Sequence, residues 1–331
     1  MSDTKQFYEE MKARMVDYKT NILGIAEKGK RRGREYDHIL PSQQWPLNLW
    51  SGIQRQSIEY FSKNDIRWHR ERDNLLSSQV LCINVFFPLR NHPHLLDNML
   101  REFYPSLDRV NSVDFEYIGP QDYFNEGGGR GYNRTSADVS IKWKDNKDAD
   151  NLLLVEFKFT EQNFGGCGRG ENPHPEWCDD GKFILESPET ACYRASEKKR
   201  PYWKKIMPEQ GEGILKLSML KKTPCCPFKH EFYQLMRNQL FAHCLANDSD
   251  VKLHTAEFAV CHDERNKDIV TLSHPVEGNR DAFAVWESFL RTPTTFKHFT
   301  VQHLLHHIDQ SVSLPTEIKE WRAFLNERYG L

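Results

Sequence analysis

Three residues in the middle of the chain have types and a spacing that suit metal-assisted chemistry. Glu156 and Lys158 lie two residues apart in the apolar segment 152–159, and Asp138 lies in the alternating segment 137–143. Residues two apart on a strand share a face, so Glu156 and Lys158 should project together. A hairpin joining the two segments would bring the Asp138 carboxylate near Glu156. The sequence therefore predicts two carboxylates and one ammonium group at one place.

This combination of groups is suited to phosphodiester hydrolysis. Two carboxylates a few ångströms apart repel each other unless a cation intervenes. Hard oxygen ligands suit Mg²⁺ or Mn²⁺, which usually take one or two carboxylates together with waters and substrate phosphate. Such an ion stabilises charge in the transition state and lowers the pKa of its bound water. In this hypothesis Lys158 orients or deprotonates the attacking water, or balances the developing negative charge.

A simpler explanation exists for the Glu156 and Lys158 pair. The two side chains could form an exposed ion pair on one face of an edge strand, which is worth at most ~1 kcal/mol. The pattern E-x-K occurs by chance in many proteins. Taken alone, the three residues therefore favour the surface ion pair, and the context has to decide.

The periodicity of apolar residues predicts the elements that position these side chains. Asn74 is expected to cap a central helix in which Leu76, Val80, Ile83 and Phe87 recur at helical spacing, with apolar residues on most other faces as well. Three strands in succession indicate one mixed sheet. The predicted strands are residues 113–118, 137–143, 152–159 and 255–261, and the other predicted helices are 4–28, 46–64, 93–103, 231–246, 280–290, 301–310 and 315–327.

Two segments are expected to be irregular. The glycines of 125–134 permit backbone conformations that other residues resist, which indicates a flexible turn beside the site. Residues 162–228 are rich in Gly, Pro, Cys and charge, and are interpreted as a long insertion with one short helix near 189–197.

The predicted elements divide the chain into three parts. Residues 1–40 form an N-terminal helix followed by a basic run, 28–34, which we interpret as an arm or flexible lead-in. Residues 41–265 form the core with its insertion. Residues 266–331 form a C-terminal helical extension that packs on the core.

Four segments resemble a known family. Residues 130–138 (RGYNRTSAD) and 152–158 (LLLVEFK) look like the core of the PD-(D/E)XK superfamily, the restriction-endonuclease-like fold. Residues 77–84 and 233–239 are similar to flanking helices of uncharacterised bacterial restriction-endonuclease-like proteins. The resemblance covers roughly residues 40 to 265. It changes the preferred interpretation of the three residues from a surface ion pair to an active site.

The resemblance implies an α/β (α+β mixed) core with a central mixed sheet of four or more strands flanked by helices. It also implies a divalent metal ion on Asp138, Glu156 and the main-chain carbonyl of Phe157, with nucleic acid as the substrate. Many members carry another acid on the first core helix, where this chain offers only amides. Glu116 is a candidate replacement, as are Asp114 and Glu59.

Several polar residues are candidates to support the site. Gln79 and Asn84 flank the apolar stripe of the central helix and need partners there, so each either tethers a neighbouring strand or positions metal-bound water. Some helicase-associated members carry a Q-x-x-x-Y motif on the later helix, which neither Gln234 nor Gln239 matches. The candidate supporting residues are Gln79, Asn84, Ser136, Gln234, Arg237 and Gln239.

Basic residues interleaved with aromatic ones could pair phosphate charge with surfaces for base stacking. Such residues gather in the insertion, and two arginines of the glycine-rich turn are expected to contact phosphate. The alternative is a solvated charged face. The predicted DNA-contact residues are Arg130, Arg134, Lys198, Lys199, Arg200, Trp203, Lys204 and Lys205.

Cysteines concentrate in the insertion, but they form no C-x-x-C pair. A structural zinc or iron–sulfur site at Cys167, Cys178, Cys192 and Cys225 is therefore the less favoured interpretation, and ordinary reduced thiols are preferred. A surface role is also preferred for the histidines of the predicted C-terminal helix, which are His303, His306 and His307.

Composition limits the function classes. The 331 residues carry 45 Lys and Arg against 47 Asp and Glu, which excludes a uniformly basic coat but not a local basic groove. No apolar run approaches the ~20 residues of a membrane span, and the start MSDTKQFYEE lacks the apolar region of a signal peptide. We therefore expect a cytosolic protein with no membrane partner.

The preferred prediction is a Mg²⁺-dependent nuclease that cuts double-stranded DNA, with a role in restriction or defence by analogy. A homodimer would let two sites cut both strands. The alternative is a non-catalytic module that keeps the fold and binds nucleic acid or assembles with other proteins, and the missing helix acid motivates it.

Overall fold

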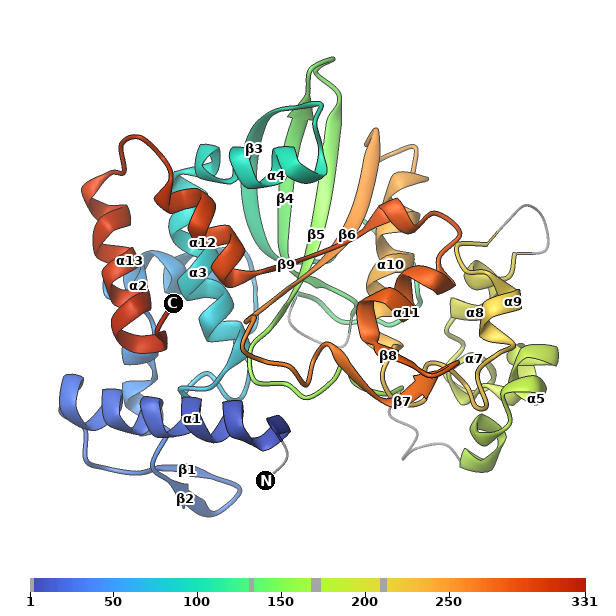
Figure 1. Cartoon of the computed structure of the whole chain (residues 1–331), viewed down its shortest axis with the longest axis horizontal. Helices are drawn as coiled ribbons and strands as arrows, with labels where there is room; N and C mark the ends of the chain where they lie inside the picture. Colours follow the sequence, from blue (N-terminus) through green and yellow to red (C-terminus); the bar gives the residue numbers. More distant parts are fainter. Residues whose placement is uncertain (1–2, 131–133, 168–173, 209–212) are drawn as a thin grey trace.

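The computed structural model describes residues 3–130, 134–167, 174–208 and 213–331, and its centre is a five-stranded sheet (Figure 1). The strand order is β3-β4-β5-β6-β9, with antiparallel pairing from β3 to β5 and parallel pairing from β5 to β9. The predicted mixed sheet flanked by helices is confirmed. The strands span Leu107–Tyr117 (β3), Ala137–Asp145 (β4), Asp150–Lys158 (β5), Thr255–His262 (β6) and Phe296–Thr300 (β9).

Helices cover both faces of the sheet (Figure 1). Alternate residues of β5 enter different cores: Val155 and Phe157 pack with the helices of one side, and Leu152 and Leu154 pack with those of the other. This alternation is the period-two pattern of a strand buried on both faces. The first side carries α3 (Ser78–Asn91), α12 (Val301–Asp309) and α13 (Thr316–Tyr329), and the second carries α10 (Tyr233–Ala246) and α11 (Ala282–Phe289).

The central helix predicted from the sequence is α3, whose residues from Gln79 to Leu89 are all buried. Its N-cap is Ser77, whose hydroxyl accepts a hydrogen bond from the Val80 amide, so the predicted cap at Asn74 is wrong. The Asn74 side chain instead accepts from the Leu76 amide at 3.0 Å, within the turn that leads into the helix. Asn is a strong turn former as well as a good cap, which explains the error.

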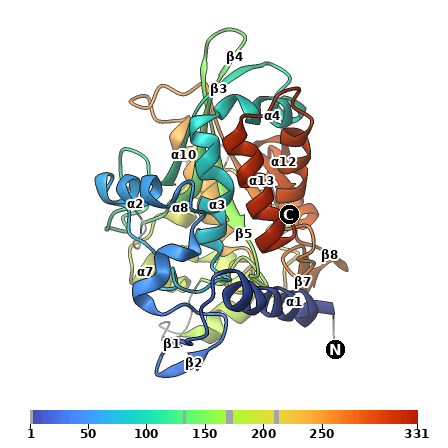
Figure 2. The same cartoon turned by 90° about the vertical axis from the view of Figure 1, so that its left-hand side faces the viewer.

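The N-terminal segment forms more regular structure than the sequence suggests. Helix α1 (Asp3–Asp17) continues into a π-helical turn, Tyr18–Ile22. The basic run that follows is not a flexible arm, because it forms a hairpin of β1 (Gly29–Arg31) and β2 (Arg34–Tyr36), drawn below α1 in Figure 2. The sequence did not indicate this hairpin because its strands are mostly charged and have no apolar face to produce a period-two pattern.

The segment between the N-terminal hairpin and β3 is helical, as predicted, but more broken. The single helix predicted over 46–64 is a 3₁₀ segment followed by α2, and that predicted over 93–103 is a 3₁₀ turn followed by α4. The bounds are Ser42–Asn48 and Pro93–Leu96 for the 3₁₀ segments, Gln54–Lys63 for α2 and Asp97–Phe103 for α4.

The insertion folds into a chain of short helices packed against α10 and α11. Two of them, at 188–191 and 193–196, replace the single short helix predicted near 189–197. Their bounds are Pro175–Asp179 (3₁₀), Gly181–Glu186 (α5), Pro188–Ala191 (α6), Tyr193–Ser196 (α7), Tyr202–Ile206 (α8) and Leu217–Leu220 (α9).

The C-terminal part is not purely helical. Strand β9 pairs in parallel with β6 and so completes the central sheet from a segment that we assigned to a helical extension. A small hairpin of β7 (Thr271–Val276) and β8 (Asn279–Asp281) and a 3₁₀ turn, Pro293–Thr295, also lie in this part. Among the described residues, no helix combines the length and apolar character needed to cross a bilayer.

Candidate active site

The hairpin of β4 and β5 brings the three predicted residues together. Its register pairs Val139 with Val155, which places Asp138 beside the stretch that carries Glu156. The Phe157 amide donates a hydrogen bond of 2.7 Å to Oδ2 of Asp138. The aspartate is therefore fixed to the backbone of the strand that carries the other two groups.

Glu156 and Lys158 form an ion pair, but it is not a surface pair. Nζ of Lys158 lies 2.7 Å from Oε1 of Glu156. Lys158 is 5% exposed and Glu156 is 6% exposed. Their strand is the third of five, with neighbours on both sides. An exposed ion pair on an edge strand is thus excluded as the explanation.

Helix α10 covers this ion pair with two amide side chains one turn apart. Nζ of Lys158 donates to Oε1 of Gln234 at 2.8 Å, and Nδ2 of Asn238 donates to Oε2 of Glu156 at 2.7 Å. Residues i and i+4 share a helix face, which explains why both reach the same pair. Gln234 was among the predicted supporting residues, whereas Asn238 was not, although its spacing from Gln234 was the available signal.

A third carboxylate, Glu116, lies at the end of β3 and is almost fully buried. Its Oε1 accepts from Nε2 of Gln79 at 2.8 Å, and its Oε2 accepts from Oγ of Ser136 at 2.9 Å. Nε2 of His69 lies 3.9 Å away. The backbone of Glu116 has a φ of 48°, a left-handed conformation that is uncommon outside glycine and asparagine and that often marks functional positions.

The carboxylates strongly affect each other's charge. Burial raises the pKa of Asp138 well above its ordinary value, and the nearby charges of Glu156 and Glu116 raise it further. Burial opposes the charge on Lys158, but the carboxylates of Glu156, Glu161 and Asp138 outweigh it and raise the pKa of the ammonium. These shifts favour the charged form of Lys158, whereas the ionised form of Asp138 is disfavoured unless an added cation stabilises it.

The three carboxylates do not yet form a closed ligand set. Within the described part of the chain, Asp138, Glu156 and Glu116 do not place three oxygens within 4.8 Å of one another. Both oxygens of Glu156 are engaged, one by Lys158 and one by Asn238. The donor chemistry fits a hard divalent cation, provided that Glu156 exchanges one of these partners for the ion.

These groups line an open cleft of about 1080 Å³. Its wall also carries four arginines from distant parts of the chain and the acidic side chain of Glu161. Arg70 and His69 come from the loop after α2, a segment with no periodic pattern or motif that could predict their place. The cleft arginines are Arg31, Arg70, Arg134 and Arg237.

Two predicted supporting residues lie elsewhere. The Asn84 side chain accepts from the Trp50 amide and donates to the carbonyl of Asn48 and the hydroxyl of Tyr329, so it ties helices together. Gln239 donates to Thr295, near the start of β9. Neither residue lines the cleft, because each faces a different side of its helix from the residues that do.

The two arginines of the glycine-rich turn have different surroundings. Arg130 pairs with Asp114 at 2.8 Å and donates to the carbonyls of Phe115 and Glu116, so it holds the end of β3 and is not free for phosphate. Arg134 donates to the carbonyl of Ile118 at 3.2 Å and lines the cleft.

The basic part of the insertion does not line the cleft. The Trp203 side chain is buried at 3% exposure, so its predicted use as a stacking surface is wrong. Arg200 donates to the carbonyls of Asn125 and Glu126. Four more residues of the predicted DNA contact also lie outside the cleft lining. They are Lys198, Lys199, Lys204 and Lys205.

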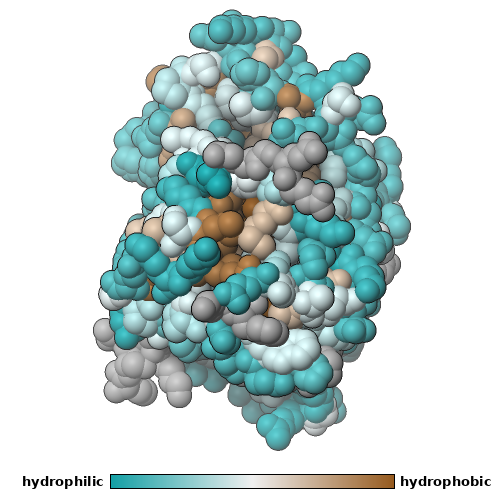
Figure 3. All heavy atoms as spheres, turned by 90° about the vertical axis from the view of Figure 1, so that its right-hand side faces the viewer, coloured by the Kyte–Doolittle hydropathy of each residue, from teal (hydrophilic) through white to brown (hydrophobic). Residues whose placement is uncertain are grey.

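Four cysteines of the insertion line one apolar pocket. Three of them were named in the less favoured metal site, and the fourth is Cys226 in place of Cys225. Figure 3 shows the side of the molecule that carries the insertion, with an apolar hollow set in a hydrophilic surface. All eight cysteines of the chain are described and none forms a disulfide. Burial raises the pKa of Cys167 to about 11, which favours the reduced, protonated thiol. The pocket cysteines are Cys167, Cys178, Cys192 and Cys226.

Comparison with protein families identifies the class of the chain. The model of a family described as "Restriction Endonuclease associating with ARP" matches residues 11–330, and the chain belongs to this family. The match supports a restriction-endonuclease-like protein with nucleic acid as its partner. No curated protein and no solved structure matches the chain significantly.

Proposed function

We propose that this protein is a Mg²⁺-dependent nuclease of the PD-(D/E)XK type that hydrolyses DNA phosphodiester bonds. The observation that carries the proposal is the group of Asp138, Glu156 and Lys158 at the wall of an open, arginine-lined cleft. Family membership supports a nuclease but does not define its metal or its substrate. A divalent cation would offset the repulsion between these carboxylates.

In this proposal Asp138, Glu156 and the carbonyl of Phe157 hold the ion, and Glu116 is a further ligand or binds metal-bound water. When bound, the ion would lower the pKa of a water molecule and stabilise charge on the phosphate. Gln79 and Ser136 keep the Glu116 carboxylate oriented toward the cleft. Glu116 thus takes the place of the acid that the first core helix lacks, and Gln79 on that helix positions it.

The raised pKa of Lys158 favours two of the three roles considered for it. A charged ammonium cannot accept a proton, so we assign Lys158 to orienting the attacking water and balancing negative charge. Gln234 holds the ammonium through its Oε1 atom and leaves it able to donate toward substrate.

The substrate that best fits the cleft is double-stranded DNA. Arg70 and Arg134 come from distant segments of the chain and line the same cleft as the carboxylates, so both are available to contact phosphate there. A homodimer would present two such sites to the two strands. None of the eight cysteines forms a disulfide, which is consistent with a reducing compartment, so we place this activity in the cytosol, as part of defence against foreign DNA.

The test is a cleavage assay on supercoiled plasmid and linear DNA with purified protein. We expect cleavage with Mg²⁺ or Mn²⁺ and none with EDTA. Equal cleavage in the presence and absence of a chelator would contradict metal dependence. A single-stranded RNA substrate of matched length serves as the comparison, and its preferential cleavage would overturn the DNA assignment.

One observation favours a second candidate, a non-catalytic DNA-binding module. Both oxygens of Glu156 already have partners, and the carboxylates do not converge on one point. If Glu156 keeps both of these partners, the protein binds DNA in the cleft but does not cleave it, whether Mg²⁺ or Mn²⁺ is added. DNA binding without metal-dependent cleavage would therefore favour the module.

We predict that Arg70→Ala weakens DNA binding. Arg70 is exposed on the cleft wall, and removing one phosphate contact should reduce the salt dependence of log Kd by about one unit of slope. Fluorescence anisotropy between low and moderate salt measures this slope. Lys63→Ala removes an exposed cation of α2 outside the cleft lining and is the matched control. Identical slopes for both variants would place the DNA elsewhere.

A further inference from the structure

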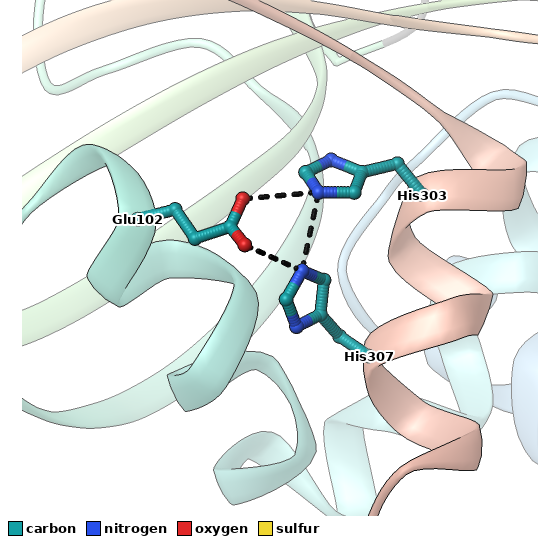
Figure 4. A group of neighbouring side chains, drawn as sticks. All are labelled: Glu102, His303 and His307. Carbon is teal, nitrogen blue, oxygen red and sulfur yellow. Dashed lines mark hydrogen bonds and ion pairs between the residues drawn. The ribbon is translucent and has the colours of Figure 1, made fainter.

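A second group of metal-ligand side chains lies between α4 and α12, outside the cleft. Oε2 of Glu102 lies 3.0 Å from Nε2 of His303, and Oε1 lies 2.9 Å from Nε2 of His307. The two imidazole Nε2 atoms are 3.1 Å apart. Figure 4 shows both rings pointing at the same carboxylate, so three ligand atoms form a triangle.

The backbone of both helices is held independently of this triangle. His303 and His307 are one turn apart on α12, whose other face is buried through Leu304 and Ile308. The Phe103 ring, next to Glu102, packs on the His303 ring with centroids 6.5 Å apart. Packing therefore brings the two helices together, which reduces the entropy lost when an ion binds between them.

The separations suit one small divalent ion. Zinc binds imidazole nitrogen and carboxylate oxygen at about 2.0–2.2 Å in a tetrahedral arrangement, which places neighbouring ligand atoms about 3.3 Å apart. Shifts of a few tenths of an ångström would convert the triangle into three such ligands. Two imidazoles favour a transition metal such as Zn²⁺ over the Mg²⁺ proposed for the carboxylate-rich cleft.

An arrangement without metal satisfies these atoms less well. Each neutral imidazole can donate from Nε2 to the carboxylate, but the two donors then face each other at 3.1 Å. Protonating one ring strengthens its attraction to Glu102, but the two Nε2–H groups still face each other. A cation at the centre uses the lone pairs of both nitrogens and of the carboxylate together.

We infer that Glu102, His303 and His307 form a binding site for a zinc-class divalent ion that links α4 to α12. None of the three residues lines the cleft, so this site is independent of the proposed catalytic ion. Three protein ligands leave a fourth tetrahedral position for water. The ion fastens α12 to α4, the helix that precedes β3.

Metal analysis of untagged protein tests this inference, because a histidine tag would itself bind zinc. The protein is loaded with Zn²⁺, dialysed extensively and analysed for zinc per chain. We expect the His303→Ala/His307→Ala variant to hold one equivalent less than the wild type, and Zn²⁺ to raise the wild-type Tm by roughly 5 °C. His306→Ala is the matched control, since His306 is exposed and contacts Gln310 instead.

A second variant guards against misfolding of the double substitution. Glu102 has a half-exposed side chain, so Glu102→Gln should leave the fold intact while weakening Zn²⁺ binding by more than about 100-fold. Titration with Co²⁺ gives an independent signal, since tetrahedral coordination produces visible absorption that this variant should lose.

Two results would overturn the site. One is zinc content and Co²⁺ absorption that are the same in wild type, Glu102→Gln and the double histidine variant, which would assign the metal to other groups such as the pocket cysteines. The other is the absence of any retained zinc or Zn²⁺-dependent Tm shift in the wild type, which would leave an ion pair only. Neither result depends on nuclease activity.

Discussion

Asp138→Asn is expected to lower metal-dependent DNA cleavage by about 10³-fold or more, which corresponds to roughly 4 kcal/mol of transition-state stabilisation. The asparagine oxygen can still accept the hydrogen bond from the Phe157 amide, so the hairpin of β4 and β5 should keep its shape. Only the negative charge that would hold the ion is lost. Single-turnover cleavage with saturating protein measures the effect on the chemical step.

The control for this substitution lies at the other end of the same hairpin, on β5. Asp150 is half exposed and pairs with Lys144, so Asp150→Asn removes an equal charge without touching the cleft. It should cleave DNA like the wild type. Cleavage by Asp138→Asn at the same rate as Asp150→Asn would remove Asp138 from the active site, although the protein could still be a nuclease with its site elsewhere.

Lys158→Met is expected to lower the free energy of unfolding by about 3–5 kcal/mol at neutral pH without metal. The substitution leaves the buried carboxylate of Glu156 with only the Asn238 amide and removes the charge that offsets repulsion by Asp138. Urea unfolding measures the loss. Mg²⁺ should recover part of it, because the ion replaces the missing cation.

Substituting Asp138 is expected to change the free energy of unfolding in the opposite direction. Its pKa is raised in the folded state, so its ionised form destabilises the fold above the pKa of the unfolded chain, and Asp138→Asn should stabilise the protein at neutral pH. The double variant Lys158→Met/Asp138→Asn should therefore cost less than Lys158→Met alone. Lys142→Met, at an exposed position of β4, is the control. If Lys158→Met loses no more free energy of unfolding than Lys142→Met, the Lys158 ammonium does not offset the repulsion between the buried carboxylates.

The local parts of the site could be predicted from the sequence. Asp138 and the Phe157 amide are 19 residues apart and belong to one hairpin, so period-two alternation was enough to place Asp138 beside Glu156 and Lys158. The same pattern predicted three of the five strands of the sheet in succession. Strand β9 was missed because a five-residue strand between a turn and a helix is too short for periodicity to identify.

Long-range contacts could not be predicted in the same way. The amide of Asn238 reaches Glu156 across 82 residues, and only the packing of α10 on the sheet brings the two together. The burial of Trp203 shows the converse error, because a basic and aromatic stretch has the same composition whether its rings face solvent or a core. The approach of Arg70 to the cleft depends on loop geometry, which leaves no pattern in the sequence.

The contact between α10 and β5 also affects when the cleft can form during synthesis of the chain. A growing chain has made the whole β4–β5 hairpin long before Gln234 and Asn238 leave the ribosome, so the hairpin then carries its charges without their amide partners. Domains generally fold as units as they emerge. The completed cleft therefore requires a chain that has emerged through α10, and a translation product that stops before α10 lacks the amides that contact Glu156 and Lys158.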